Sequence, residues 1–191
     1  QRMALEDRNG PGTMDRQRLA ILEALADAVF MTDKAGALTY LNPAWEGIMG
    51  FPAARALGMP LLSYLLPDDR AVGLAHLPAL LEGELEQCRF EARYLARDGS
   101  ARWLDAAAQV VRGDDGAITG VVGRLTDVTQ RRAAEADAAR ERDFCAAIID
   151  ASDALVLVLD ATGRCVRLNA VAASFLGVKD VAATGGLGWE L

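Results

Sequence analysis

The sequence predicts an α+β fold, in which helices gather on one face of an antiparallel sheet. Three long strand-like segments, residues 86–97, 101–112 and 117–127, follow one another with only glycine-containing turns between them. Two shorter apolar runs, residues 28–33 and 37–41, come earlier in the chain, and short helix signals lie between the two groups. Consecutive strands with helices collected between them are typical of an antiparallel sheet covered on one side.

The composition limits the classes of function that are open to this chain. Its 191 residues are 52% hydrophobic and 25% charged, which is ordinary globular usage. The formal net charge of −7 argues against nucleic-acid binding, because phosphate contacts need clustered Lys and Arg. No apolar run approaches the roughly 20 residues of a membrane span, and three scattered cysteines indicate a reducing compartment. We therefore expect a cytoplasmic chain that binds neither nucleic acid nor membrane.

The first elements follow from local signals. Residues 15–26 carry leucines at helical spacing, and residues 33–36 form a tight turn between the first two strands. Asn42 and Pro43 predict a helix start, with Asn42 as the N-cap and Pro43 at the first helical position. This short helix is expected to end at Gly50, because glycine readily adopts the left-handed conformation that terminates helices.

Further helices are expected before the long strands. Pro52 opens a short helical segment that ends at Gly58. The acidic segment 67–69 predicts the start of a longer helix, since negative charge is favourable at a helix N-terminus. That helix is expected to end near Gly83, and Pro78 inside it to kink or split it.

A long helix is expected after the last strand. From residue 129 to residue 151 the composition changes to Ala, Arg, Glu and Asp without Gly or Pro. The best heptad seam is poor, because two of its positions are charged and two are alanine. Its positions are Arg131, Ala134, Ala138, Glu141, Cys145 and Ile148. Weak pairing in a coiled coil and a plain spacer are both consistent with this pattern.

The sequence also contains an internal repeat. Four landmark residues recur in one register, each 127 positions later (169 − 42 = 127). The pairs are Asp33 and Asp160, Gly36 and Gly163, Asn42 and Asn169, and Gly50 and Gly177. Such a repeat indicates a second copy of the same unit. We therefore expect a tail, a complete unit, a linker helix and a truncated second unit, with bounds 1–18, 19–129, 130–151 and 152–191.

In their order and spacing, these motifs resemble the PAS domain of bacterial sensory proteins. The resemblance covers residues 19–129 and begins again near Phe144. The motifs that carry it are Asn42-Pro43-Ala44-Trp45, Gly50-Phe51, Gly58, Pro67-Asp68-Asp69-Arg70, Asp98-Gly99-Ser100, Arg102-Trp103 and Asp127-Val128-Thr129. The resemblance implies a five-stranded antiparallel sheet curved over a small internal cavity. It also implies a sensing or dimerising module upstream of a signalling output.

Nothing in the chain predicts catalysis or a required cofactor. The single histidine, His76, has no nucleophile motif beside it, so we expect no enzyme within these residues. Some PAS domains bind haem through a histidine on the corresponding helix, so the resemblance makes His76 a candidate axial ligand of haem. The simpler interpretation is that His76 is a surface or partly buried histidine of this helix without a ligand. For flavin, residues 61–66 lack the reactive cysteine of light-sensing members, and Cys88 is interpreted as structural. The cofactor, if there is one, stays unidentified.

Small side chains on the inward face of the sheet leave volume that must be filled by a ligand or by the protein itself. The candidate pocket residues are Met31, Asn42, Trp45, Met49, Leu65, Leu104, Ala106, Ala108, Gly120 and Val122. Arg93 and Arg124 are expected either to meet a carboxylate of the ligand or to be solvated. A ligand pocket and a self-filled core are both open at this point.

Asp127 and Thr129 lie where the last strand gives way to the long helix. A threonine at a helix start caps free backbone amides, which is the simpler interpretation of Thr129. The resemblance implies more, namely that this Asp-x-Thr joint couples the sheet to the outgoing helix.

We therefore expect a homodimeric sensory module of a two-component or related signalling protein. A small ligand or a partner shifts the last strands, and the long helix transmits the shift to an output domain, as a change in populations. By resemblance the output is a histidine kinase or a cyclic-di-GMP enzyme. A ligand-free dimerisation scaffold and a haem or flavin sensor are the alternatives.

Overall fold

The computed structural model describes residues 20–177, and the chain divides into two compact units, Gln1–Arg132 and Ala133–Leu191. The first unit contains a five-stranded antiparallel sheet with the spatial order β2-β1-β5-β4-β3. Its strands are β1 (Ala28–Thr32), β2 (Leu38–Leu41), β3 (Gln87–Leu95), β4 (Ala101–Arg112) and β5 (Ile118–Asp127). The predicted α+β class and the antiparallel five-stranded sheet are confirmed.

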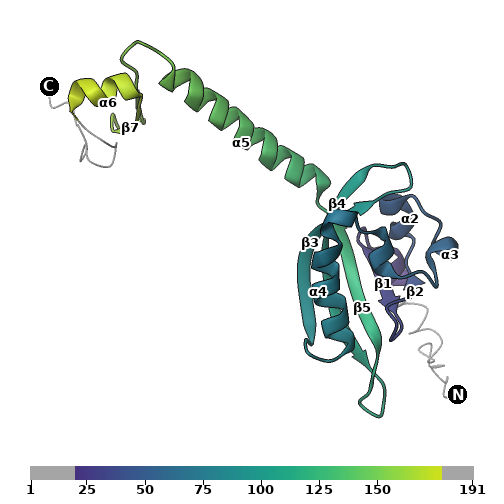
Figure 1. The fold of residues 1–191 in the computed structure, drawn as a ribbon. Helices are drawn as coiled ribbons and strands as arrows, with labels where there is room; N and C mark the ends of the chain where they lie inside the picture. The colour runs from purple at the N-terminus through teal and green to yellow at the C-terminus, as the bar shows by residue number, and fades with distance from the viewer. Residues whose placement is uncertain (1–19, 178–191) are drawn as a thin grey trace, which may run out of the picture. The chain divides into compact units, whose positions relative to one another are not determined.

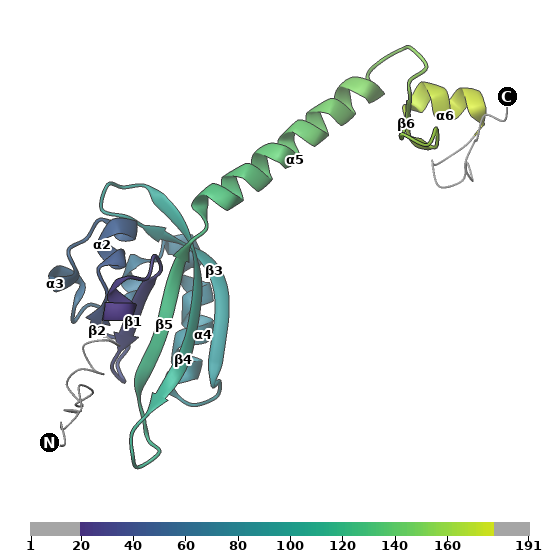
Figure 2. The same ribbon diagram turned by 180° about the vertical axis from the view of Figure 1, so that it is seen from behind.

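Short helices cover one face of this sheet (Figure 1). They are α2 (Ala44–Met49), α3 (Ala53–Ala56), the 3₁₀ turns η1 (Leu61–Tyr64) and η2 (Pro67–Asp69), and α4 (Arg70–Leu81). Seen from behind, strands β4 and β5 lie in front of α4, and no helix of residues 20–177 covers them on that side (Figure 2). Within the described residues, the sheet of the first unit therefore has an inner face that helices cover and an outer face without helices over these two strands.

Two details of the helices differ from the sequence prediction. The acidic segment that was expected to open α4 forms the separate 3₁₀ turn η2, and the α-helix begins at Arg70. Pro78 lies inside α4 without splitting it, and the helix continues to Leu81. The carbonyl of Pro78 accepts a hydrogen bond from the amide of Glu82, so the last turn closes in spite of the missing proline N–H.

The core lies between the helices and the inner face of the sheet. From the strands it contains Phe30, Tyr94, Leu104, Val121 and Leu125, and from the helical segment Trp45, Met49, Leu61, Leu65, Leu77 and Leu80. All of these side chains are buried. Large apolar side chains that interdigitate in this way supply most of the stability of a domain of this size.

The register of the sheet overturns part of the predicted inward face. Met31 pairs with Val122 across β1 and β5, and Val122 in turn pairs with Gln109 of β4. Since Leu104 and Ala106 of β4 face the core, Gln109 and its partners lie on the outer face. Gly120 alternates with the inward Val121 and so belongs to the outer row as well. The prediction that Met31, Gly120 and Val122 line the inner face is therefore wrong.

The second unit repeats the local structure of the first. After α5 (Thr129–Asp150), strands β6 (Leu157–Leu159) and β7 (Cys165–Leu168) form an antiparallel pair, and α6 (Ala170–Leu176) follows. The Asp33 carboxylate accepts hydrogen bonds from the amides two and four residues later, and Asp160 does the same in the second unit. Both turns end in a glycine with positive φ.

Among residues 20–177, no helix combines the length and the apolar character that crossing a bilayer requires.

Candidate sensory core and linker joint

The structure brings five of the predicted pocket residues together beneath the sheet. These residues are Trp45, Met49, Leu65, Leu104 and Ala106, and all are buried in one cluster. Ala108 packs against the same cluster and is partly buried. Large side chains of α2, η1 and α4 belong to the same buried cluster as the alanines of β4. The core of the first unit is therefore largely filled by its own residues.

Trp45 is the residue of this core with an unmet polar group. Its indole ring packs edge-on against Tyr64, with ring centroids 5.0 Å apart, and the side chain is fully buried. The Nε1–H group has no hydrogen-bond acceptor. An unsatisfied buried donor costs about 1–3 kcal/mol. A small molecule that brought an acceptor atom to Trp45 Nε1 would recover this energy.

The neighbouring phenols keep the core uncharged. Burial raises the pKa of Tyr64, and burial also raises the pKa of Tyr94 on β3. A tyrosine is already neutral at physiological pH, and burial disfavours the charged phenolate of both side chains further.

Asn42 has a structural role that differs from the predicted N-cap. Helix α2 is preceded by Pro43 and receives no side-chain cap hydrogen bond. The Asn42 side chain turns away from the helix: Nδ2 donates to the carbonyls of Leu22 (2.8 Å) and Asp27 (3.0 Å). Its Oδ1 accepts from the amide of Val29 at 2.9 Å. The prediction of an Asn42 cap is wrong, because a buried amide is needed to hold the segment before β1 against the sheet.

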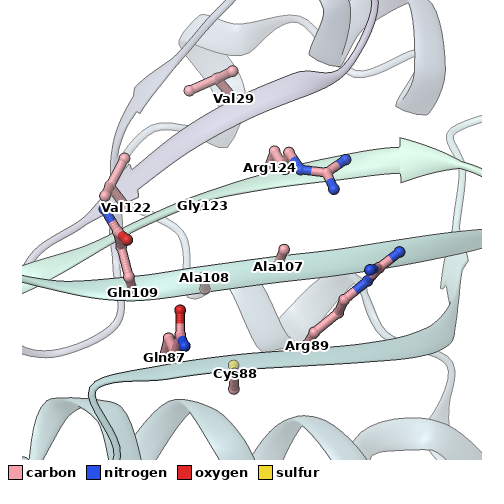
Figure 3. Close-up of a pocket in the computed structure, with 10 residues that line it drawn as sticks. All are labelled: Val29, Gln87, Cys88, Arg89, Ala107, Ala108, Gln109, Val122, Gly123 and Arg124. Atoms are coloured by element: carbon pink, nitrogen blue, oxygen red, sulfur yellow. The ribbon is translucent and has the colours of Figure 1, made fainter.

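The outer face of the sheet carries an open hollow of about 720 Å³ (Figure 3). Arg89, Ala107 and Arg124 lie in a row across β3, β4 and β5. Arg89 forms a bidentate pair with Asp105, and Arg124 donates to Asp27 at 3.0 Å. Val122, predicted as a pocket residue beneath the sheet, lines this hollow instead. Ala108 borders the hollow as well, but it also packs against the core beneath the sheet.

Neither arginine that was considered for a ligand carboxylate lacks a partner within the protein. Arg124 is paired with Asp27 on the outer face. Arg93 forms two hydrogen bonds from its guanidinium to the Asp69 carboxylate, at 2.7 and 3.0 Å. The carboxylates that meet Arg93 and Arg124 therefore belong to this chain.

The joint between β5 and α5 is tied to the neighbouring strand. The Thr129 amide donates to Asp127 Oδ1, and the Trp103 amide of β4 donates to Thr129 Oγ1, both at 2.9 Å. The Val128 amide donates to the Trp103 carbonyl, also at 2.9 Å. The Thr129 hydroxyl accepts from β4 rather than from an amide of α5, because the chain leaves β5 close beside that strand. The first residue of the helix is thus hydrogen-bonded to the sheet.

Sequence reasoning missed a second attachment of α5. Arg131 and Arg132, in the first turn of α5, both donate to the Glu91 carboxylate on β3. The Arg132 guanidinium also lies over the Trp103 ring, 4.7 Å from its centroid. The adjacent arginines directly after Thr129 were the available signal, but their acidic partner lies forty residues earlier in the chain.

Two family profiles match the chain. The profile described as PAS fold matches residues 16–128, and one described as PAS domain matches residues 146–191. The first match spans more than half of the 191 residues. The chain belongs to the PAS family.

Relatives of this PAS chain include signalling kinases. Sporulation kinase C of Bacillus subtilis is 26% identical over 122 residues, which cover 64% of this chain and 28% of the relative. A solved sensory box histidine kinase/response regulator from Burkholderia thailandensis is 31% identical, with a TM-score of 0.52, and covers 68% of this chain and 97% of the solved one. The chain spans less than a third of the curated relatives that it matches.

A PAS domain structure from Colwellia psychrerythraea has the same fold. It is 23% identical, with a TM-score of 0.56, and covers 61% of this chain and 98% of the solved one. The family match and the kinase relatives place the chain among sensory signalling modules.

The surroundings of His76 do not fit a haem ligand in this PAS domain. Nδ1 lies 2.8 Å from the Val72 carbonyl one turn earlier in α4. The imidazole stacks on Phe90, with ring centroids 4.8 Å apart and 24° between the planes. Both contacts are those of a side chain that packs against its own helix and the neighbouring strand. Among the described residues, no cluster of His, Cys, Asp and Glu has the arrangement of a metal site.

The ion pairs of the PAS domain predict an acid-sensitive fold. Hydrogen bonds from Arg93 lower the pKa of Asp69, and hydrogen bonds from Arg132 and Arg131 lower the pKa of Glu91. A carboxyl whose pKa is lowered on folding stabilises the protein above its unfolded pKa of about 4, and that stability is lost as the pH falls through the folded pKa.

We expect the free energy of unfolding, measured by urea titration, to fall steadily between about pH 5 and pH 2. Asp69→Asn is expected to make this dependence shallower, because the variant removes one titrating partner of Arg93. An equally steep pH dependence in the variant would contradict this assignment.

Proposed function

We propose that the first unit is the sensory input module of a larger bacterial signalling protein. A small molecule in the core, or a partner at its surface, shifts the last strands of the sheet. The joint at Asp127 and Thr129 passes this shift to α5, which re-pairs with the α5 of a second copy. The change biases an output domain through populations of two states rather than through chemistry in this module.

The single observation that carries the proposal is the way α5 begins. Thr129 is at once the first residue of the helix and the hydrogen-bond acceptor for the Trp103 amide. A movement of β4 against β5 therefore displaces the first turn of α5 through this hydrogen bond. A plain helix cap would lack this bond across to the sheet.

A histidine kinase is the output that the relatives favour. One relative is named a sporulation kinase and another a sensory box histidine kinase/response regulator. A cyclic-di-GMP enzyme is the alternative output. In either case the catalytic centre belongs to another part of the protein.

A ligand-free dimerisation scaffold is the second candidate function. The filled core favours it, since the buried side chains under the sheet leave little room. The buried Nε1–H group of Trp45, which has no hydrogen-bond acceptor, favours a ligand. An acceptor atom on the ligand would remove the cost of leaving this donor unsatisfied. A ligand of this core would be small, largely apolar, and equipped with one hydrogen-bond acceptor.

The exposed face of α5 supports pairing with a second copy. Phe144 and Ile148 lie one turn apart and are more than half exposed. Cys145 is exposed between them and falls on the predicted heptad seam with Ile148. Apolar side chains exposed at this spacing are typical of a helix that pairs with another helix. The alanines of the remaining seam bury little area, so the pairing is expected to be weak enough to change.

Native mass spectrometry of the purified chain tests the proposal. We expect a dimer, and a bound small molecule that the Trp45→Phe variant no longer retains. A dimer without any retained molecule, and with no thermal shift from small apolar acceptors, would favour the scaffold. A strict monomer at micromolar concentration would overturn the dimeric relay.

Mild oxidation with diamide provides the matched geometric test. If α5 pairs in parallel along the predicted seam, a disulfide forms between the Cys145 residues of two chains. Cys145→Ser removes the thiol on the seam and is expected to abolish the covalent dimer. Cys88 and Cys165 remain as internal controls, since both are less exposed.

A further inference from the structure

A continuous series of side-chain contacts connects the start of α4 to the start of α5. The contacts run along the outer side of the edge strand β3. Their members are Asp69, Arg93, Trp103, Arg132 and Glu91. None of these residues except Trp103 belongs to the joint that links β5 to α5.

The first contact holds η2 to β3. Asp69 Oδ2 accepts from both the amide (2.6 Å) and Nε (3.0 Å) of Arg93, and Asp69 Oδ1 accepts from Nη2 (2.7 Å). The Leu66 amide donates to the Arg93 carbonyl at 2.9 Å. The backbone and the side chain of Arg93 are thus both fixed to the segment that opens α4. A displacement of this segment must displace Arg93.

The second contact joins Arg93 to Trp103. The two residues are directly opposite each other in the register of β3 and β4. The Arg93 guanidinium lies over the indole, 5.6 Å from the ring centroid, and the Arg132 guanidinium lies 4.7 Å from the same centroid. One indole therefore contacts an arginine fixed to α4 and an arginine of α5. Both distances are within the range of cation–π attraction.

The third contact anchors the helix. Glu91 lies two residues before Arg93 on β3, and so projects from the same face of the strand. One carboxylate oxygen accepts from Arg131 at 2.6 Å and the other from Arg132 Nε at 2.6 Å. The first turn of α5 is therefore held beside Trp103 by two charge-assisted hydrogen bonds.

We propose that Trp103 is the positioning residue that couples the start of α4 to the start of α5, through Arg93 on one side and Arg132 on the other. The proposal rests on the proposed relay and names a second route into α5. Residues 66–69 adjoin Leu65 of the buried core, so a change in the core reaches Arg93 without passing through β5. The route needs the planar, delocalised guanidinium, because a lysine ammonium cannot pair bidentately with Asp69 while it covers the indole.

The coupling is expected to be modest but measurable. Exposed single ion pairs contribute little, whereas bidentate pairs joined into a network contribute more. The Asp69 side chain is only 14% exposed and that of Glu91 24%, so solvent screens these pairs incompletely. Coupling along such contacts typically changes equilibria by about twofold to thirtyfold.

Amide hydrogen exchange of the 191-residue chain, followed by NMR, tests the coupling. The probe is the first hydrogen-bonded amides of α5, beginning with that of Arg132, which donates to the Val128 carbonyl. Asp69→Asn, which touches no residue of α5 directly, is expected to speed their exchange by about threefold or more. In a Trp103→Leu background the same change is expected to have no further effect. Equal effects of Asp69→Asn in both backgrounds, or none in either, would overturn the proposal.

Two matched variants separate the coupling from general loss of stability. Glu86→Gln breaks the surface pair with Arg112 at the far end of β3 and is expected to leave α5 exchange unchanged. Arg93→Lys keeps the charge beside Asp69 but loses the planar group, and is expected to act like Trp103→Leu. Unchanged coupling in Arg93→Lys would also refute the role of the guanidinium. The exchange measurement requires neither a dimer nor a ligand. A negative result would therefore refute the coupling through Trp103 and leave the proposed sensory function untouched.

Discussion

Replacing Gly120 with alanine is expected to lower the free energy of unfolding of the first unit by about 3 kcal/mol. A Cβ atom at Gly120 would lie 1.9 Å from the carbonyl oxygen of Thr32 and 2.9 Å from its carbonyl carbon. The obstacle is the backbone of β1, so no rotamer change can relieve it. Strands β1 and β5 must separate locally, which weakens their pairing at the centre of the sheet.

The measurement is a urea titration followed by tryptophan fluorescence. Trp189→Phe provides the background, so that the signal comes from Trp45 and Trp103 of the first unit. Gly47→Ala is the matched control, because its Cβ meets no atom within 4 Å and the residue lies inside helix α2. Alanine is the better helix former by up to about 1 kcal/mol, so the control is expected to be neutral or stabilising. A loss below about 1 kcal/mol in Gly120→Ala would show that β1 can yield.

The close approach at Gly120 also explains an error of the sequence analysis. In β5 both alternate faces carry apolar, small and polar residues, so the alternation did not show which face is inward. The glycine was interpreted as space left beneath the sheet, but the structure places it against the backbone of β1. Only the pairing of β5 with β1, two segments about ninety residues apart, distinguishes these cases.

Elements with strong local signals were predicted well. The hairpin at Asp98-Gly99 and the ends of β4 follow from turn chemistry that involves only neighbouring residues. The left-handed glycine that ends α2 at Gly50 is likewise local.

Long-range partners were missed for the same physical reason. Glu91 alternates in β3 like any solvated strand residue, and nothing near it in the chain indicates Arg131 and Arg132. Asparagine is a residue type that commonly caps helices, but the partners of the Asn42 side chain lie up to twenty residues earlier in the chain. Spacing along the chain can predict what a residue is able to bond, and only the fold decides which partner reaches it.

The repeat supplies the second large prediction. Asn42 and Asn169 make equivalent bonds: Oδ1 of each accepts from a valine amide, at Val29 and Val156. Nδ2 of each donates to carbonyls of the preceding segment, at Leu22 in the first unit and Ile149 in the second. The same side chain thus ties the chain before each unit to its first two strands.

Asn42→Ala is expected to lower the free energy of unfolding of the first unit by about 3 kcal/mol, because a buried amide and two carbonyls lose their partner at once. Fluorescence of Trp45 and Trp103 during urea titration reports the loss, in the same Trp189→Phe background. Asn169→Ala removes the equivalent bonds from the other unit and is expected to leave this transition unchanged. Equal losses in both variants would mean that the two units unfold together, and a small loss in Asn42→Ala would mean that water replaces the buried bonds.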